Sequence, residues 1–304
     1  MTDVNQTLPT DAAVETAARD VREEAAAQDV ARPDSRRPLA VAILRAAALR
    51  ALPILAAIVG LLAIWYLVSY AVLTPERRFL LPPPHQVVGE TLTDPVIMDP
   101  MLTALWQTVK VALAGLLIAV VIGMLWAVVM SLSPISEKIL YPYAVILQTI
   151  PILALTPLIG IWMNYGFSAR IVVAVIISVF PMISNTFFGL QSASAAAHDL
   201  FTLNRATWWH RLLKLKFPAA VPAIFTGLRN AAGLSVIGAI VGDFYFQQGK
   251  PGIGGLLRTY TLRLSMEPLF MAIILTALFG VVVFSIFAAL DRAVIGRWYG
   301  SSRR

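Results

Sequence analysis

The sequence lacks cysteine altogether, and it has few other side chains that could bind a metal or carry out chemistry. Its three histidines, His85, His198 and His210, lie at scattered positions. The absence of cysteine excludes disulfides, thiolate metal sites and cysteine nucleophiles. No carboxylate pair, Ser–His set or metal-ligand cluster occurs at a plausible spacing. We therefore expect no catalytic residue, no metal site and no cofactor in this chain.

Charge is also scarce. Only 13% of the 304 residues are charged and 58% are hydrophobic, whereas a soluble domain has about 25% charged and 45–50% apolar residues. The mean hydropathy of +0.76 agrees with this composition. The net charge of +7 does not indicate nucleic-acid binding, because the basic residues lie beside long apolar runs and form no basic stripe with interleaved aromatic residues. The composition indicates a membrane protein.

The apolar runs are long enough to cross a bilayer, which takes about 20 residues of helix. Five runs without a charged residue cover residues 51–73, 111–132, 139–163, 171–190 and 268–290. A sixth span is predicted at 224–242, where Arg229 lies near one end and can extend to the membrane surface. The predicted fold class is an all-α integral membrane protein with six transmembrane helices.

The distribution of basic residues predicts the orientation of these helices. Most of the 24 Lys and Arg residues fall in segments on the same side as the N-terminus. Cytoplasmic segments are enriched in Lys and Arg, so both termini are expected in the cytoplasm. Residues 1–38 cannot bury a core and are predicted to be a mobile cytoplasmic tail, which leaves 39–304 as the transmembrane domain.

Ionisable groups are missing from the centres of the predicted spans, which contain no Asp, Glu, Lys or His. Ion-coupled carriers generally need such groups at membrane depth, so this mechanism is disfavoured. Weakly polar residues do occur there, and helix–helix packing accounts for most of them. The alternative is a pathway lined by weakly polar side chains. Its candidate residues are Gln148, Thr149, Thr156, Ser184, Asn185 and Ser235.

The segment 191–217, between the fourth and fifth spans, is predicted to form one or two short amphipathic helices. Trp208, Leu212 and Leu215 form an apolar stripe at helical spacing. Arg211, Lys214 and Lys216 accompany the stripe. This pattern is consistent both with a helix lying on the membrane surface and with a helix that docks on a partner.

The same segment resembles the coupling loop of permease subunits of bacterial ATP-binding cassette importers. In that family an acid–Ala–Ala triplet precedes a glycine, and a proline follows thirteen residues after the glycine. Alignment on Pro218 places Asp199 at the acidic position and Arg205 at the glycine position, which is a departure from the family pattern. The resemblance implies ATPase-coupling roles for Asp199, Leu200, Phe201, Arg205, Ala206, Thr207 and Trp209.

Three further segments resemble the permeases for nitrate, sulfonates, taurine and thiamine precursors. They are the proline-rich 81–88, the stretch 148–162 followed by Gly166, and 238–243 followed by 251–254. The resemblance covers roughly residues 50–295.

The resemblance implies the partners and the location of the chain. Two permease chains, usually identical, would enclose a pathway in the bacterial inner (plasma) membrane. The coupling loops would dock on two cytoplasmic ATPase subunits, and an extracytoplasmic binding protein would deliver the solute. The chain contains no Gly-x-x-x-x-Gly-Lys-Ser/Thr loop, so ATP hydrolysis is expected on separate subunits and the chain itself is not expected to be an enzyme.

Two other functions are considered. A self-sufficient carrier or channel would transport solute without nucleotide or partner, and a membrane scaffold or sensor would bind partners and transport nothing. Among solutes, the sequence favours a vitamin or vitamin precursor, such as a thiamine pyrimidine or riboflavin. Aliphatic sulfonates, taurine and nitrate remain open, as does pairing with a different permease chain.

Overall fold

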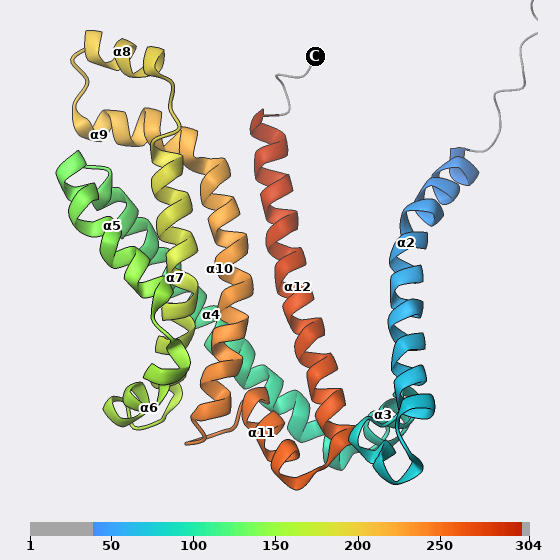
Figure 1. Ribbon diagram of the computed structural model, residues 1–304. Helices are drawn as coiled ribbons and strands as arrows, with labels where there is room; N and C mark the ends of the chain where they lie inside the picture. Colours follow the sequence, from blue (N-terminus) through green and yellow to red (C-terminus); the bar gives the residue numbers. More distant parts are fainter. Residues whose placement is uncertain (1–38, 300–304) are drawn as a thin grey trace, which may run out of the picture. The chain divides into compact units, whose positions relative to one another are not determined.

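The computed structural model describes residues 39–299, and every regular element within them is a helix (Figure 1). The predicted tail, 1–38, lies outside the described residues. The elements are α2 (Leu39–Leu67), η1 (Val68–Val72), η2 (Pro75–Leu80), α3 (Pro84–Thr91), α4 (Pro95–Met130), α5 (Pro134–Thr149), α6 (Ile152–Trp162), α7 (Phe167–Leu190), α8 (Ala195–Leu203), α9 (Trp208–Arg211), η3 (Leu212–Lys216), α10 (Phe217–Tyr245), α11 (Ile253–Arg263) and α12 (Met266–Tyr299).

The chain divides into two units, one ending at Ile64 and the other starting at Trp65. In the first unit, the described side chains of α2 are almost all apolar and exposed, including Leu52, Ile54 and Leu61. A surface of this kind suits contact with lipid tails.

The predicted membrane spans correspond to long apolar helices. Five helices are long and apolar enough to cross a membrane, and a sixth span is obtained if the bent pair α5–α6 is taken as one. The all-helical membrane fold is thus confirmed, with six as the upper count. The helices extend beyond the predicted runs: α4 begins at Pro95, well before the predicted start at residue 111.

The third predicted span, 139–163, is not one continuous helix. Its two parts, α5 and α6, meet at an angle of 95°. Ile150, between them, has extended backbone angles and is followed by Pro151. A residue before proline is disfavoured in the helical conformation, which explains why α5 ends there.

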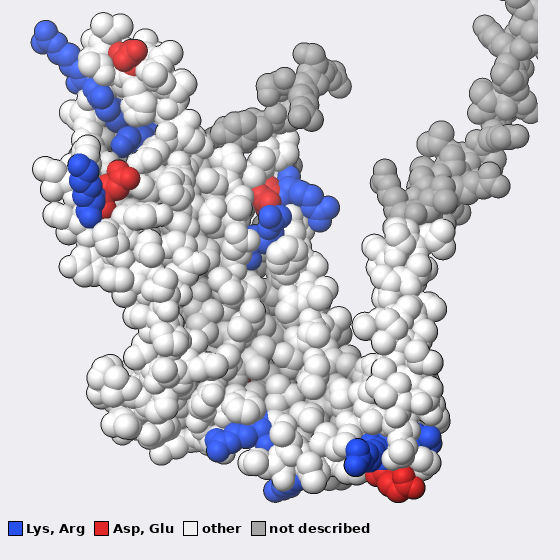
Figure 2. Space-filling model, in the orientation of Figure 1, with Lys and Arg blue, Asp and Glu red and all other residues white. Residues whose placement is uncertain are grey.

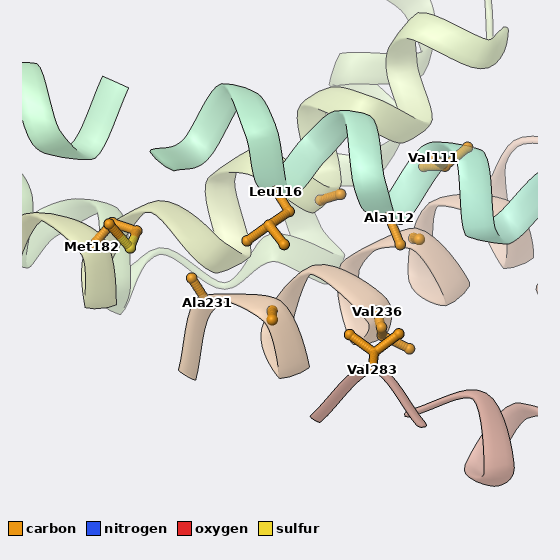
Figure 3. Packing of buried hydrophobic residues seen from close by; sticks show 10 residues of the cluster. Val111, Ala112, Leu116, Met182, Ala231, Val236 and Val283 are labelled. Carbon is orange, nitrogen blue, oxygen red and sulfur yellow. The ribbon is translucent and has the colours of Figure 1, made fainter. Parts of the chain in front are cut away.

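The core of the second unit lies where α4, α7 and α10 cross. Figure 3 shows Leu116 and Ala112 of α4 facing Ala231 and Val236 of α10, and Met182 of α7 belongs to the same cluster. Small residues allow the close approach. A Cβ atom on Gly115 would lie 2.6 Å from the Cβ of Ala174, and one on Gly238 would lie 2.6 Å from its Cα. Close packing of small residues is the usual means by which helices associate in membranes.

The second unit has two opposite ends, one on each side of this core. At one end, α7 leads into α8 and α9, which return the chain to α10 (Figure 1). At the other end lie α6, the loop after α10 and α11. A second apolar cluster, which includes Val87, Met101, Ile253 and Met271, fixes α11 against α3, α4 and α12. The candidate sites lie at these two ends.

Candidate functional site

Two short helices form in the segment 191–217, as the sequence predicts. Each begins at a hydroxyl that caps it: Ser194 Oγ accepts a hydrogen bond from the Ala197 N–H, and Thr207 Oγ1 accepts one from the His210 N–H. Such caps satisfy backbone donors that have no partner inside the helix. After α9 the chain continues through η3 into α10, so the second short helix is joined directly to a long membrane helix.

The turn between α8 and α9 places Arg205 in a left-handed conformation, with φ of 49°. The Arg205 N–H donates to the Thr202 carbonyl, and the Ala206 N–H donates to the Phe201 carbonyl at 2.9 Å. This pair of bonds is the Schellman motif, in which glycine is the preferred residue at the left-handed position. The chain therefore makes the turn that a glycine would favour, although it carries an arginine.

Five of the seven predicted coupling residues line one hollow. It has a volume of about 440 Å³ and is lined by Leu200, Phe201, Asn204, Arg205, Ala206, Thr207, His210 and Lys214. Trp209 lies outside it, in a smaller depression with His210 and Leu213. Asp199 lines neither depression and is exposed on α8. The turn thus brings most of the predicted residues together.

Large apolar side chains are exposed around this hollow. Leu203 is 83% exposed and Trp209 is 65% exposed, and Leu200 and Leu213 are also exposed. We call these four side chains, with Phe201, Arg205, Ala206 and Thr207, the coupling surface. The predicted stripe lies elsewhere, since Trp208 and Leu212 pack into a core cluster with Leu190 and Ala220. The stripe holds the short helices onto the bundle, and other residues of the same segment face outward.

Two polar contacts hold the segment 191–217, one to the end of α4 and one across its own turn. The Lys216 ammonium donates to the Ser131 carbonyl, just after the end of α4, at 3.3 Å. Arg211 Nε donates to the Ala206 carbonyl, also at 3.3 Å. The segment 191–217 is thus joined to the end of α4 by a hydrogen bond and to α7 and α10 by the chain itself.

The six predicted pathway residues are spread over four helices, α5, α6, α7 and α10. Gln148 and Thr149 are exposed at the end of α5, and Ser184 and Asn185 are partly buried on α7. Thr156 and Ser235 are buried, and their hydroxyls donate to carbonyls of their own helices, those of Ile152 and Ala232. Their role in a pathway remains a prediction.

A larger groove, which the sequence did not indicate, runs between α10 and α12. Its volume is about 810 Å³, and its polar lining residues include Arg229, Asn230 and Thr276. The nearest Arg229 and Asp291 charged atoms lie 3.7 Å apart, so the arginine has a partner close to the groove.

A buried ion pair at the other end of the unit was also missed. Arg170 and Asp243 are each 1% exposed and lie 3.3 Å apart. Thr108 of α4 donates to the other carboxylate oxygen and accepts a hydrogen bond from the Ile253 N–H. Arg170 also donates to the Gln248 and Lys250 carbonyls. The network joins α4, α7 and α10 to the loop before α11.

The pair could not be read from the sequence because its members are 73 residues apart and each lies at the edge of an apolar run. The packing of Gly252 explains part of the 251–254 pattern. A Cβ atom at this position would lie within 1.9 Å of the Asp243 carboxylate, so only glycine fits there without a shift of the carboxylate.

Comparison with known proteins gives a consistent result. The chain is 30% identical over 235 residues to the formylaminopyrimidine transport permease protein ThiX of Halalkalibacterium halodurans, covering 77% of this chain and 91% of the relative. It is 33% identical over 223 residues to a probable ABC transporter permease protein of Haemophilus influenzae, covering 72% of this chain and 86% of the relative. It is 24% identical over 241 residues to the putative aliphatic sulfonates transport permease protein SsuC of Bacillus subtilis, covering 79% and 85%.

The family model described as "Binding-protein-dependent transport system inner membrane component" matches residues 119–296, which include the core helices α7 and α10 and the whole coupling surface. The long apolar helices, the two-helix segment and the glycine-mediated core agree with this match. The chain belongs to the family of inner membrane components of binding-protein-dependent transport systems.

Proposed function

We propose that the chain is the permease subunit of an ATP-driven importer, that two copies enclose the translocation pathway, and that separate ATPase subunits bind the coupling surface. ATP binding would close the ATPase pair and move α8 and α9. The extracytoplasmic binding protein would deliver solute to the outward-open state, and hydrolysis would restore the inward-open state.

The observation that carries this proposal is the coupling surface itself. It combines exposed leucine and tryptophan side chains with a hollow of about 440 Å³, and it lies on a segment directly joined to α7 and α10. Large apolar side chains around a concavity are typical of a protein interaction site. The basic residues of this segment support its placement in the cytoplasm.

For the solute, we propose a vitamin or vitamin precursor such as a thiamine pyrimidine. The relative from Halalkalibacterium halodurans is named for formylaminopyrimidine transport. The relative from Bacillus subtilis is named for aliphatic sulfonates, so sulfonate uptake is the competing assignment to be measured beside it.

The first experiment is a gentle detergent pull-down of the tagged chain from its own host, with identification of the co-purifying proteins. We expect an ATPase that carries a phosphate-binding loop, and reconstitution of the complex should give ATP-dependent uptake. A chain that purified alone and transported solute in liposomes without ATP would overturn the proposal in favour of a self-sufficient carrier or channel.

A second experiment tests the docking of ATPase subunits on the segment 191–217. Asp199→Lys and Ala206→Trp, in the assembled transporter, should leave ATP hydrolysis largely in place and abolish most ATP-driven uptake. Gln86→Lys, an exposed change on α3 at the opposite end, is the control and should transport normally. Normal uptake by both the Asp199→Lys and the Ala206→Trp variants would contradict the docking assignment.

A further inference from the structure

A polar hollow of about 400 Å³ opens at the end of the second unit opposite to the coupling surface. Its lining includes Gln107 and Lys110 of α4, Gly166 and Arg170 at the start of α7, and Gln248 and Lys250 of the loop after α10. None of the residues that line it is acidic. It is therefore a concave site built from three separate parts of the chain, with cationic and amide side chains in its wall.

The charge of the hollow is positive. Asp243 balances the charge of Arg170 through their buried contact at 3.3 Å. Lys110 and Lys250 are exposed, and neither forms an ion pair among the described residues. Figure 2 shows blue side chains and no red ones beside the lower end of α10 in that view. The two lysines thus leave an uncompensated positive charge around the hollow.

Hydrogen-bond donors without acceptors lie at the same place. The N-cap of α7 is Gly166, which has no side chain to cap the helix. The first-turn N–H groups of a helix have no partner inside it, and they form the positive end of its dipole. In addition, Arg170 Nε has no hydrogen-bond partner among the described residues, although its side chain is only 2% exposed. A buried donor without a partner needs an acceptor.

We propose that this hollow binds an oxyanion, such as a sulfate, a sulfonate, a carboxylate or a phosphate group. Lysine ammonium groups and uncapped helix N–H groups are the donors with which proteins bind such anions. Two sources could supply the group, a free anion or the phosphate of a lipid headgroup. The site goes beyond the proposed transport function and does not depend on it.

Thermal unfolding of the full chain in dodecyl maltoside, an uncharged detergent that carries no phosphate, tests the site. Sodium sulfate is titrated against sodium chloride at equal ionic strength, so that general screening is matched. We expect a saturable rise in the unfolding temperature of the unaltered chain, because a ligand that binds the folded state stabilises it. Lys110→Gln and Lys250→Gln should each raise the half-saturating sulfate concentration about two- to fivefold, and the double variant should lose the saturable rise.

The controls are Arg258→Gln and Arg263→Gln on α11, which remove positive charge at the same end but outside the hollow. They should keep the response to sulfate. The proposal is overturned if the unaltered chain shows no saturable rise, if the double lysine variant keeps it, or if the α11 controls lose it to the same extent. Both lysines are exposed, so their replacement should leave the fold intact.

Repetition with phosphatidylglycerol added to the detergent distinguishes the two sources. If a headgroup phosphate occupies the hollow, this lipid will stabilise the unaltered chain and reduce the effect of sulfate, and it will stabilise the double variant less. If a free anion is the ligand, sulfate will act equally with and without the lipid. A negative result here would overturn the anion site and would not change whether the chain co-purifies with an ATPase. The anion site and the proposed permease function can therefore fail independently.

Discussion

At the scale of single residues, Arg205 adopts the left-handed conformation at a position where the resemblance predicts a glycine. A non-glycine residue in the left-handed region costs about 1–2 kcal/mol, yet the two Schellman hydrogen bonds of the turn are both present. The cap and the attachment of α9 through η3 to α10 hold the turn in place. The arginine therefore raises the energy of the turn, and the hydrogen bonds of the turn are still formed.

We predict that Arg205→Gly stabilises the folded chain by up to about 1 kcal/mol, because glycine relieves the left-handed strain but is itself more flexible when unfolded. Leu264, with φ of 53°, ends α11 in the same conformation, and Leu264→Gly should behave alike. Asn204→Gly, at φ of −81°, is the control and should destabilise slightly. The unfolding temperature in detergent measures all three. A fall for Arg205→Gly would mean that contacts of the arginine side chain outweigh the strain.

The buried Arg170–Asp243 pair leads to a second prediction at this scale. Asp243→Asn leaves the guanidinium buried without a counter-charge, which should cost about 3–5 kcal/mol. Replacing both members by apolar residues, Arg170→Met with Asp243→Leu, should recover most of the loss because no charge then remains buried. The free energy of unfolding in detergent and denaturant is the measurement.

The matched control for the buried pair is Asp291→Asn, which breaks the Arg229–Asp291 contact. That pair is 3.7 Å apart and partly exposed, so its loss should cost less than about 1 kcal/mol. If Asp243→Asn and Asp291→Asn lower the free energy of unfolding equally, burial does not increase the cost of breaking the first pair.

At the scale of helices, the crossing of α7 and α10 depends on glycine at one position and tolerates a side chain at another. A Cβ atom on Gly238 would meet the backbone of Ala174 at 2.6 Å, whereas one on Gly233, in the same helix, would meet nothing within 4 Å. We predict that Gly238→Ala destabilises the chain by about 1–3 kcal/mol through overpacking. Gly233→Ala should stabilise it by up to about 1 kcal/mol. The unfolding temperature of each variant is the measurement. If both temperatures rise, or both fall, this view of the crossing is contradicted.

The helices illustrate which features could be predicted from the sequence. The apolar runs revealed almost all the spans, because length and composition alone decide whether a helix suits a bilayer. The bend at Pro151 is local, and its direction depends on packing that the sequence does not display. The Arg170–Asp243 pair and the assembly of the coupling surface join residues far apart along the chain or across a turn, so local patterns could not predict their geometry.

At the scale of the whole second unit, its two ends carry different chemistry. One end presents the exposed apolar side chains of the coupling surface, and the other presents the cationic hollow beside α7. This division is compatible with the proposed importer, in which ATPases would act from one side and solute would arrive from the other. The assignment of the coupling surface to the cytoplasm still rests on the distribution of Lys and Arg.

The absence of cysteine from the sequence makes this orientation directly measurable, since any introduced cysteine is the sole thiol. Leu203 on α8 and Gln247 in the loop after α10 are both exposed and lie at opposite ends of α10. In intact cells, a membrane-impermeant maleimide should label Gln247→Cys and spare Leu203→Cys, and permeabilised cells should label Gln247→Cys as before. The reverse pattern would invert the orientation and overturn the docking proposal. A further step tests the docking of the ATPase. If Leu203→Cys stays protected in permeabilised membranes and reacts once peripheral ATPase subunits are stripped off, the ATPase covers the coupling surface. The stripping is the only step in that sequence that uncovers the thiol.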